Sequence, residues 1–162
     1  MTRFASKLLI AVIAVSATYT MAQSVAQKAF ATLKNMPGTW EGTTPKGPVK
    51  VTFKVTSGGS AVMSEILGQE DMISMFHMDG ERLLLTHYCA VGNQPRMAAS
   101  VSPDGKTFTF NYVDATNLAT LDAGHMERMI LTLIDENHHT EEWVFADHGK
   151  EHRVVFDLHR AV

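Results

Sequence analysis

The residues best suited to chemistry lie around the single cysteine of the chain. Cys89 follows His87 by two residues in the stretch THYCAVGNQPRM, so in a β-strand both side chains point to one face, with their origins about 6 to 7 Å apart. An imidazole beside a thiol can form a reactive thiolate pair or supply two ligands to a soft metal ion. A structural interpretation is also open, in which Cys89 is a small buried hydrophobe and His87 a hydrogen-bonded cavity residue.

A polar loop comes directly after this pair. Asn93, Gln94 and Arg96 surround Pro95, and two interpretations are equally open. Gly92, Asn93 and Pro95 are ordinary turn residues, and Arg96 then pairs with a surface acid. Alternatively, the three polar side chains stand at the mouth of a cavity and bind a polar or anionic ligand, because a guanidinium offers a planar fork of donors.

The elements that must position these residues are mainly β-strands. Ser24 followed by Gln27 predicts a helix start, and Pro37 and Gly38 end this short helix. After it, alternating apolar and polar residues predict about nine or ten short antiparallel strands separated by Gly, Asp and Asn turn residues. Because a meander leaves two exposed edges, we expect it to close into a barrel. The predicted fold class is all-β, a single antiparallel meander barrel with a short N-terminal helix.

The last two hairpins place further ionisable groups on the inner face. A turn at residues 135–137 pairs Leu133 with His139 and Glu127 with Phe145, and a turn at residues 148–149 pairs Phe145 with His152. The face shared by these strands is otherwise apolar, and buried ionisable groups are costly unless they are paired, hydrated or bound. Glu127 and His152 near the strand ends reach solvent in the simpler interpretation, whereas His139 and Glu141 are ligand-site candidates. His138 and His159 are expected opposite one another on the outer face, as solvated surface residues.

The N-terminus predicts export. Arg3 and Lys7 precede an apolar run from Leu8 to Ala17 and small residues up to Ala22. This pattern is typical of a signal peptide over residues 1–22, since the run is too short for a permanent membrane span. Residues 23–162 then form one barrel domain, secreted or periplasmic, whose net charge changes from −3 to −5 on loss of the two cations. An acidic domain offers no basic footprint for nucleic acid, and a lone cysteine forms no internal disulfide.

A family resemblance follows from the motif GTWEG at residues 38–42 and from Arg160 at the end of the last strand. Together they resemble the lipocalin-like, or calycin, pattern, which implies that Trp40 closes one barrel end beneath Arg160. The motif also resembles the start of nitrobindin-type haem-binding barrels, and THYCAVGNQPRM resembles secreted lipocalin-like proteins of bacteria. The lipocalin disulfide is impossible here, and the proline-containing segment of nitrobindins is not seen.

The sequence therefore predicts an exported protein that binds a small, partly apolar molecule inside its barrel. No catalytic residue and no metal ligand is assigned, and the oligomeric state is left open. One alternative is haem binding through a strand histidine; another is a hydrolase or isomerase that uses a histidine with Glu or Cys; a third is an interaction module with a filled barrel and an apolar outer patch. The candidate ligand-binding residues are His87, Cys89, Asn93, Gln94, Arg96, His139 and Glu141.

Overall fold

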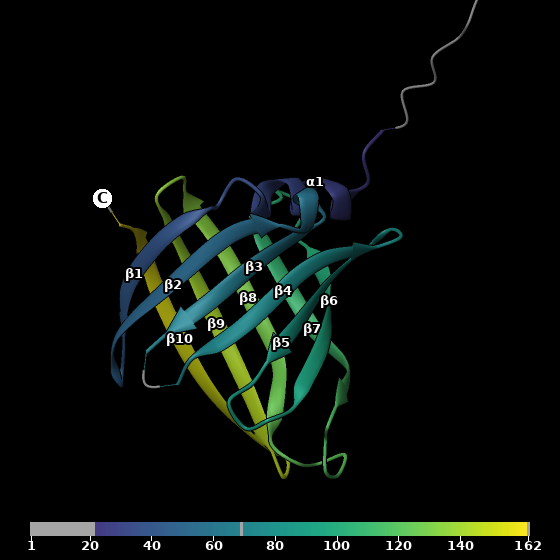
Figure 1. Cartoon of the computed structure of the whole chain (residues 1–162), viewed down its shortest axis with the longest axis vertical. Coiled ribbons are helices and arrows are strands. Elements are labelled where there is room, and N and C mark those ends of the chain that lie inside the picture. Colours follow the sequence, from purple (N-terminus) through teal and green to yellow (C-terminus); the bar gives the residue numbers. More distant parts are fainter. Residues whose placement is uncertain (1–21, 69, 162) are drawn as a thin grey trace, which may run out of the picture.

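The computed structural model describes residues 22–68 and 70–161, which form one α-helix, a short 3₁₀ turn and ten β-strands (Figure 1). Of the signal peptide predicted for residues 1–22, residues 1–21 lie outside the described residues. Among the described residues, no helix is long and apolar enough to cross a membrane. The elements are α1 (Val25–Leu33), β1 (Gly38–Thr44), β2 (Gly47–Thr56), β3 (Ala61–Leu67), β4 (Met72–Asp79), β5 (Arg82–Tyr88), β6 (Gln94–Val101), β7 (Thr107–Thr116), β8 (His125–Asp135), β9 (His138–Asp147) and β10 (Lys150–Arg160).

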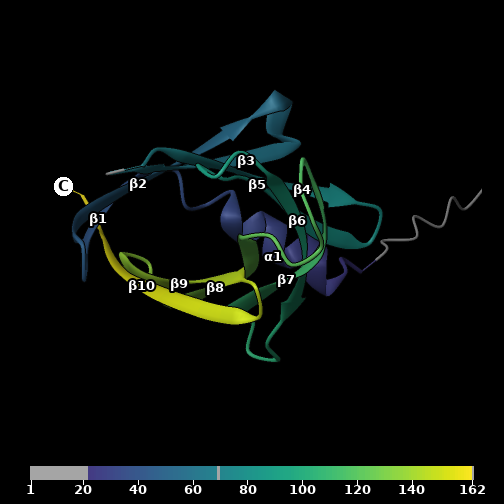
Figure 2. The same cartoon turned by 90° about the horizontal axis from the view of Figure 1, so that it is seen from below.

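The strands form a closed antiparallel barrel, as predicted. Each strand pairs with the next along the chain, and β1 pairs with β10 to close the ring. Seen from below, the strands form a flattened ring with α1 at its far end (Figure 2). Gly42 on β1 permits this closure, because a Cβ there would lie 2.0 Å from the Asp157 carbonyl oxygen of β10. Closure leaves no exposed sheet edge among the paired strands.

The helix α1 covers one end of the barrel. The Ser24 hydroxyl accepts from the Gln27 N–H, and the Gln27 side chain accepts from the Ser24 N–H, which completes the predicted capping box. Phe30 and Leu33 on the inner side of the helix are buried against the barrel core together with Met36, which follows the helix. The first strand therefore begins directly beside a closed barrel end.

The predicted pairing of the last hairpins is confirmed except near the two ends of β8. The turn predicted at residues 135–137 comprises only residues 136–137, because the register shifts after Leu133 and Asp135 pairs with His138. Leu133 pairs with His139, and Phe145 pairs with His152. Phe145 faces Met126 on β8, however, and not Glu127 as predicted. The register shifts between Met126 and Arg128, because a β-bulge adds one residue to β8 there. The bulge thereby removes Glu127 from the inner row of side chains. Its carboxylate is hydrogen-bonded to the His125 ring instead.

Because apolar and polar residues alternate, every second side chain of each strand points into the barrel. On β2, Val51 and Phe53 point inward, and Phe53 lies level with Ser64 on β3. The half of the barrel under α1 is filled by large buried side chains, which include Phe76, Leu83, Leu85, Met97, Phe108, Phe110 and Leu131. The half away from α1 is filled less completely, and it contains the candidate site.

Candidate ligand-binding cavity

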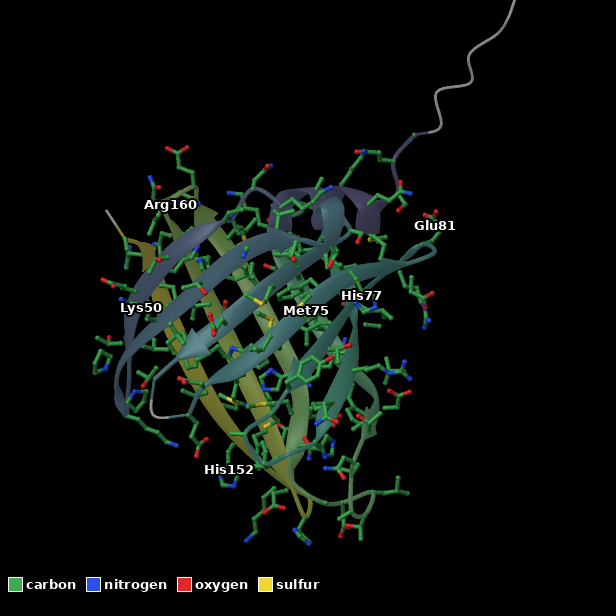
Figure 3. The ribbon with its side chains drawn as sticks, viewed as in Figure 1. Lys50, Met75, His77, Glu81, His152 and Arg160 are labelled. Carbon is green, nitrogen blue, oxygen red and sulfur yellow. The ribbon has the colours of Figure 1, made fainter. Side chains whose placement is uncertain are left out.

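A cavity of about 590 Å³ opens at the barrel end opposite α1. His152 marks this end at the bottom of Figure 3, whereas Arg160, at the other end of the same strand, lies near the top. The walls are mainly apolar. They are formed by Val49, Ile66, Met72, Met126, Trp143, Phe145, Val154 and Phe156.

Polar groups are gathered at the mouth of this cavity. Lys46 from the β1–β2 turn, Glu70 from the β3–β4 loop and His152 from the start of β10 all line it. Lys46 has no carboxylate within ion-pair distance among the described residues. Arg153 at the rim is already bound to Glu142 and Glu151. The cavity therefore has an apolar interior and a mouth that carries both signs of charge.

Trp143 forms part of the cavity wall and is held in place by a buried carboxylate. Its Nε1–H donates to Glu141 Oε2 at 2.9 Å, and the other oxygen of Glu141 lies 3.3 Å from His139 Nε2. His139 and Glu141 are fully buried and do not line the cavity. The structure thus places the two predicted ligand residues behind the wall, where they orient an indole ring, since a buried indole N–H needs an acceptor.

His87 is buried at a similar place, beside Trp143. Its Nδ1 is hydrogen-bonded to the Ser74 hydroxyl at 2.9 Å, and its ring lies 4.8 Å from the Trp143 ring. Burial lowers the pKa of His87 from 6.5 to about 4, because an imidazolium would lose its hydration there. His87 is therefore neutral at pH 7, and its Nε2 has no hydrogen-bond partner in the described part of the chain.

Cys89 comes directly after β5 and lines the cavity. Burial is the main cause that raises the pKa of Cys89, and the nearby Glu70 carboxylate acts in the same direction. The thiol is therefore protonated at neutral pH, which disfavours a nucleophilic role. His87, two residues away on the same face, bonds to Ser74 and gives no hydrogen bond to the thiol in the described residues.

The polar loop after Cys89 serves the barrel end more than the cavity. Asn93 donates to the Gly124 carbonyl at 2.7 Å, and Gln94 accepts from Thr116. These bonds tie the β5–β6 loop to the segment between β7 and β8. Arg96 forms a two-pronged ion pair with Asp114 on β7, and both are exposed. None of Asn93, Gln94 and Arg96 lines the cavity, so the ordinary turn and surface-pair interpretation describes them.

The mouth residues Lys46 and Glu70 were not among the sequence candidates. Both belong to connections between strands, where no periodic pattern reports the direction of a side chain. His152 was placed on the inner face by the hairpin pairing but was interpreted as a solvated rim residue. Its position at a strand end was the available signal.

The opposite barrel end is closed by Trp40. The Arg160 guanidinium lies 4.2 Å from the centre of the Trp40 ring, and the Trp40 Nε1–H donates to the Met36 carbonyl at 3.0 Å. Arg160 also donates to the Pro37 carbonyl at 2.8 Å. The His139 ring packs edge-on against Trp40 at 4.3 Å on the inner side. This is the arrangement that the lipocalin-like resemblance implies for these two residues.

Comparison with known proteins supports the fold. Neither a scan of protein families nor a search of curated proteins found a match. Among solved structures, the crystal structure of Rv2717c from M. tuberculosis is similar, with a TM-score of 0.54 and 16% sequence identity. The alignment covers 83% of this chain and 98% of Rv2717c. At this identity the similarity shows a common barrel fold.

Proposed function

We propose that this barrel binds a small, partly apolar molecule in the cavity at its open end. The observation that carries the proposal is the cavity itself: about 590 Å³ with mainly apolar walls and a few polar groups at the mouth. Binding sites for small molecules commonly have this composition, because apolar burial supplies affinity and a few polar groups fix orientation.

The charges at the mouth favour an amphipathic ligand. An apolar body would pack against Trp143 and the methionine and valine walls, while a polar or anionic end would remain near Lys46 and His152. Flexible methionine side chains such as Met72 and Met126 adapt to ligands of different shape. The ligand class is therefore a compact hydrophobic molecule with one polar end.

The surrounding structure supports binding with little reorganisation. Asn93, Gln94 and Asn117 join the loops of the open end by side-chain hydrogen bonds, and Asp122 accepts from the His148 backbone. A rigid site loses less conformational entropy when a ligand binds. Glu141 fixes the indole of Trp143 in the same way.

The test uses two adjacent valines of the same strand. Val154 lines the cavity, whereas Val155 faces outward and is 47% exposed. The probe is 1-anilinonaphthalene-8-sulfonate, which has an apolar ring system and one anionic group, and its binding is followed by fluorescence. Val154→Phe should weaken probe binding by about tenfold or more by filling the cavity, and Val155→Phe should leave it unchanged. Equal binding by both variants and the parent protein would reject the cavity as the site.

Haem is a second candidate ligand, favoured by one observation. Among the histidines that the structure describes on strands, His152 lines the cavity, while His87 and His139 are buried behind the wall. An axial ligand to haem iron needs an accessible imidazole nitrogen, which His152 offers. The Soret band of haemin should shift when the protein is added. A shift that is lost with His152→Ala but kept with His77→Ala would support this candidate. An unshifted band would reject it.

Two further expectations remain proposals. Export to the periplasm or exterior is supported by the residues of the N-terminal segment, and N-terminal sequencing of protein from its own cells tests it through a start near residue 23. Kinship with lipocalin-like barrels is supported by the Trp40 and Arg160 arrangement. The ten strands of this barrel differ from the eight of lipocalins.

A further inference from the structure

Three polar side chains meet on the outer face of the barrel, away from the cavity. His138 on β9 and His159 on β10 are directly opposite one another, and Asp157 precedes His159 by two residues on the same face. Since residues two apart in a strand point to the same side, the register brings all three together. The sequence indicated the two outward histidines but gave no role to Asp157.

The distances within this group fit the ligands of one metal ion. Asp157 Oδ1 lies 2.6 Å from His138 Nε2 and 3.6 Å from His159 Nε2. One ligand atom from each residue can be chosen so that all three lie within 4.8 Å of one another. In a tetrahedral zinc site, ligand atoms about 2.1 Å from the ion are about 3.4 Å apart. Small side-chain rotations would therefore complete the geometry.

The two imidazole rings are already arranged in parallel. Their centres are 4.1 Å apart and their planes differ by 22°, and both Nε2 atoms lie beside the Asp157 carboxylate. The side chains of His138, Asp157 and His159 are 26%, 61% and 64% exposed. An ion from solution can thus reach the group without any opening of the barrel.

The backbone beneath the group is well fixed. The Arg160 N–H donates to the Asn137 carbonyl and the Ala161 N–H to the Thr39 carbonyl, both at 2.9 Å. These bonds hold the end of β10 against the β8–β9 turn on one side and β1 on the other. Glu41 of β1 is paired in register with His159 and adds a second carboxylate nearby, although it also binds Lys50.

We propose that His138, Asp157 and His159 form a binding site for one divalent transition-metal ion of the zinc, copper and nickel class. A set of two imidazoles and one carboxylate suits these ions better than it suits magnesium or calcium, which prefer oxygen ligands. Three protein ligands leave a fourth position for water or an external ligand. The site joins β9 to β10, and β10 pairs on its other side with β1 to close the barrel. It is independent of the cavity and its ligand.

The test is calorimetric titration of the purified protein with zinc, using protein produced without a polyhistidine tag. The parent protein should bind one zinc ion, and magnesium should give no binding. His138→Ala and His159→Ala should each weaken zinc binding by about tenfold or more, and the double variant should abolish it. His148→Ala is the matched control, because His148 is also exposed beside the carboxylate of Asp147 but forms no three-ligand group with a second histidine in the part of the chain that the structure describes.

A second measurement separates this site from zinc bound elsewhere. Zinc should shift the imidazole ¹⁵N resonances of His138 and His159 and leave those of His148 and His77 in place. Circular dichroism checks that the variants keep the fold, which is expected because both histidines face solvent. The proposal is overturned if the parent protein binds no zinc, or if the His138→Ala, His159→Ala double variant binds it as tightly as the parent.

Discussion

The two ends of the barrel are built from the same alternating strands and differ in how they are filled. At the end near α1, Trp40 is buried between Arg160 and His139, and the helix adds Phe30 and Leu33 to the core. At the other end, the inward row continues with Trp143, two phenylalanines, and valine and methionine side chains around a cavity. Figure 1 shows α1 across the first end, while loops border the second.

This difference separates stability from recognition within one sheet. Large rings and a helix close one end, so the apolar contacts that stabilise the fold are concentrated there. The open end keeps unfilled volume. This volume reduces the stabilisation that packing contributes, but it provides a place for a ligand. His87, His139 and Glu141 lie between the two halves: Glu141 accepts from the Trp143 indole on the cavity side, and the His139 ring packs against Trp40 on the other.

The largest predicted effect concerns Trp40. Trp40→Ala should lower the free energy of unfolding by about 3–5 kcal/mol, because it removes a buried ring and its contact with Arg160. Phe145→Ala at the partly exposed cavity wall should cost clearly less, since the ring there already borders open volume. Urea unfolding of both variants measures the difference. Equal costs would break the distinction between a packed end and an open end.

Acid should destabilise the protein through His87. The unfolded state takes up a proton at this residue near pH 6.5, whereas the folded state resists protonation until about pH 4. Stability from the neutral, buried form is therefore complete above pH 6.5 and is lost as the pH falls from 6.5 to 4, by about 3 kcal/mol in total. The measurement is urea unfolding at pH 7 and pH 4. His87→Gln keeps a polar partner for Ser74 but has no group that titrates in this range. Its free energy of unfolding should therefore fall much less than that of the parent protein between pH 7 and pH 4, and most of the loss assigned to His87 should be absent. Identical pH profiles would contradict burial of a neutral His87.

Arg160 should contribute a smaller amount at the closed end. Arg160→Leu removes the guanidinium above Trp40 and its hydrogen bond to Pro37, and we expect a loss of about 1 kcal/mol in the free energy of unfolding. Arg82→Leu is the control, since Arg82 is an exposed residue in a surface ion pair with Asp79. A similar loss in both variants would show that Arg160 does not help to close the barrel.

The smallest expected effect is kinetic and concerns the open end. Cys89 should react with a maleimide more slowly than free cysteine at pH 7, because burial raises the pKa of its thiol. Val154→Phe should slow the reaction further by narrowing the cavity, and Val155→Phe should not. Mass spectrometry of the labelled protein gives the rates. Labelling faster than free cysteine would instead support an activated thiol and an enzymatic role.

Much of the fold could be predicted because local patterns and long-range structure agree. Ser24 and Gln27 predicted the helix start, and the turns predicted at residues 135–137 and 148–149 gave the pairing of His139 with Leu133 and of His152 with Phe145. The bulge on β8 was missed, because an extra residue within a strand leaves the alternating pattern ambiguous at one position.

The site was predicted less well than the fold. Sequence alternation showed that His87, His139 and Glu141 point inward, but it does not report how deep a residue lies or which ring covers it. Trp143 separates these three from the cavity, and only the assembled barrel shows this. Cys89 was expected on the inner wall, and it lines the cavity directly after the end of β5. Lys46 was missed because it lies in a turn.

The most direct test of ligand binding at the open end uses the methyl groups of methionine as reporters from the two halves of the barrel. Met72 and Met126 line the cavity, whereas Met36 and Met97 are buried outside it. With ¹³C-methyl-labelled methionine and added 1-anilinonaphthalene-8-sulfonate, we expect shifts of the methyl resonances of Met72 and Met126 and none at Met36 or Met97. Shifts at Met36 with unchanged Met72 and Met126 would contradict binding at the open end, because the ligand would then bind at the closed end.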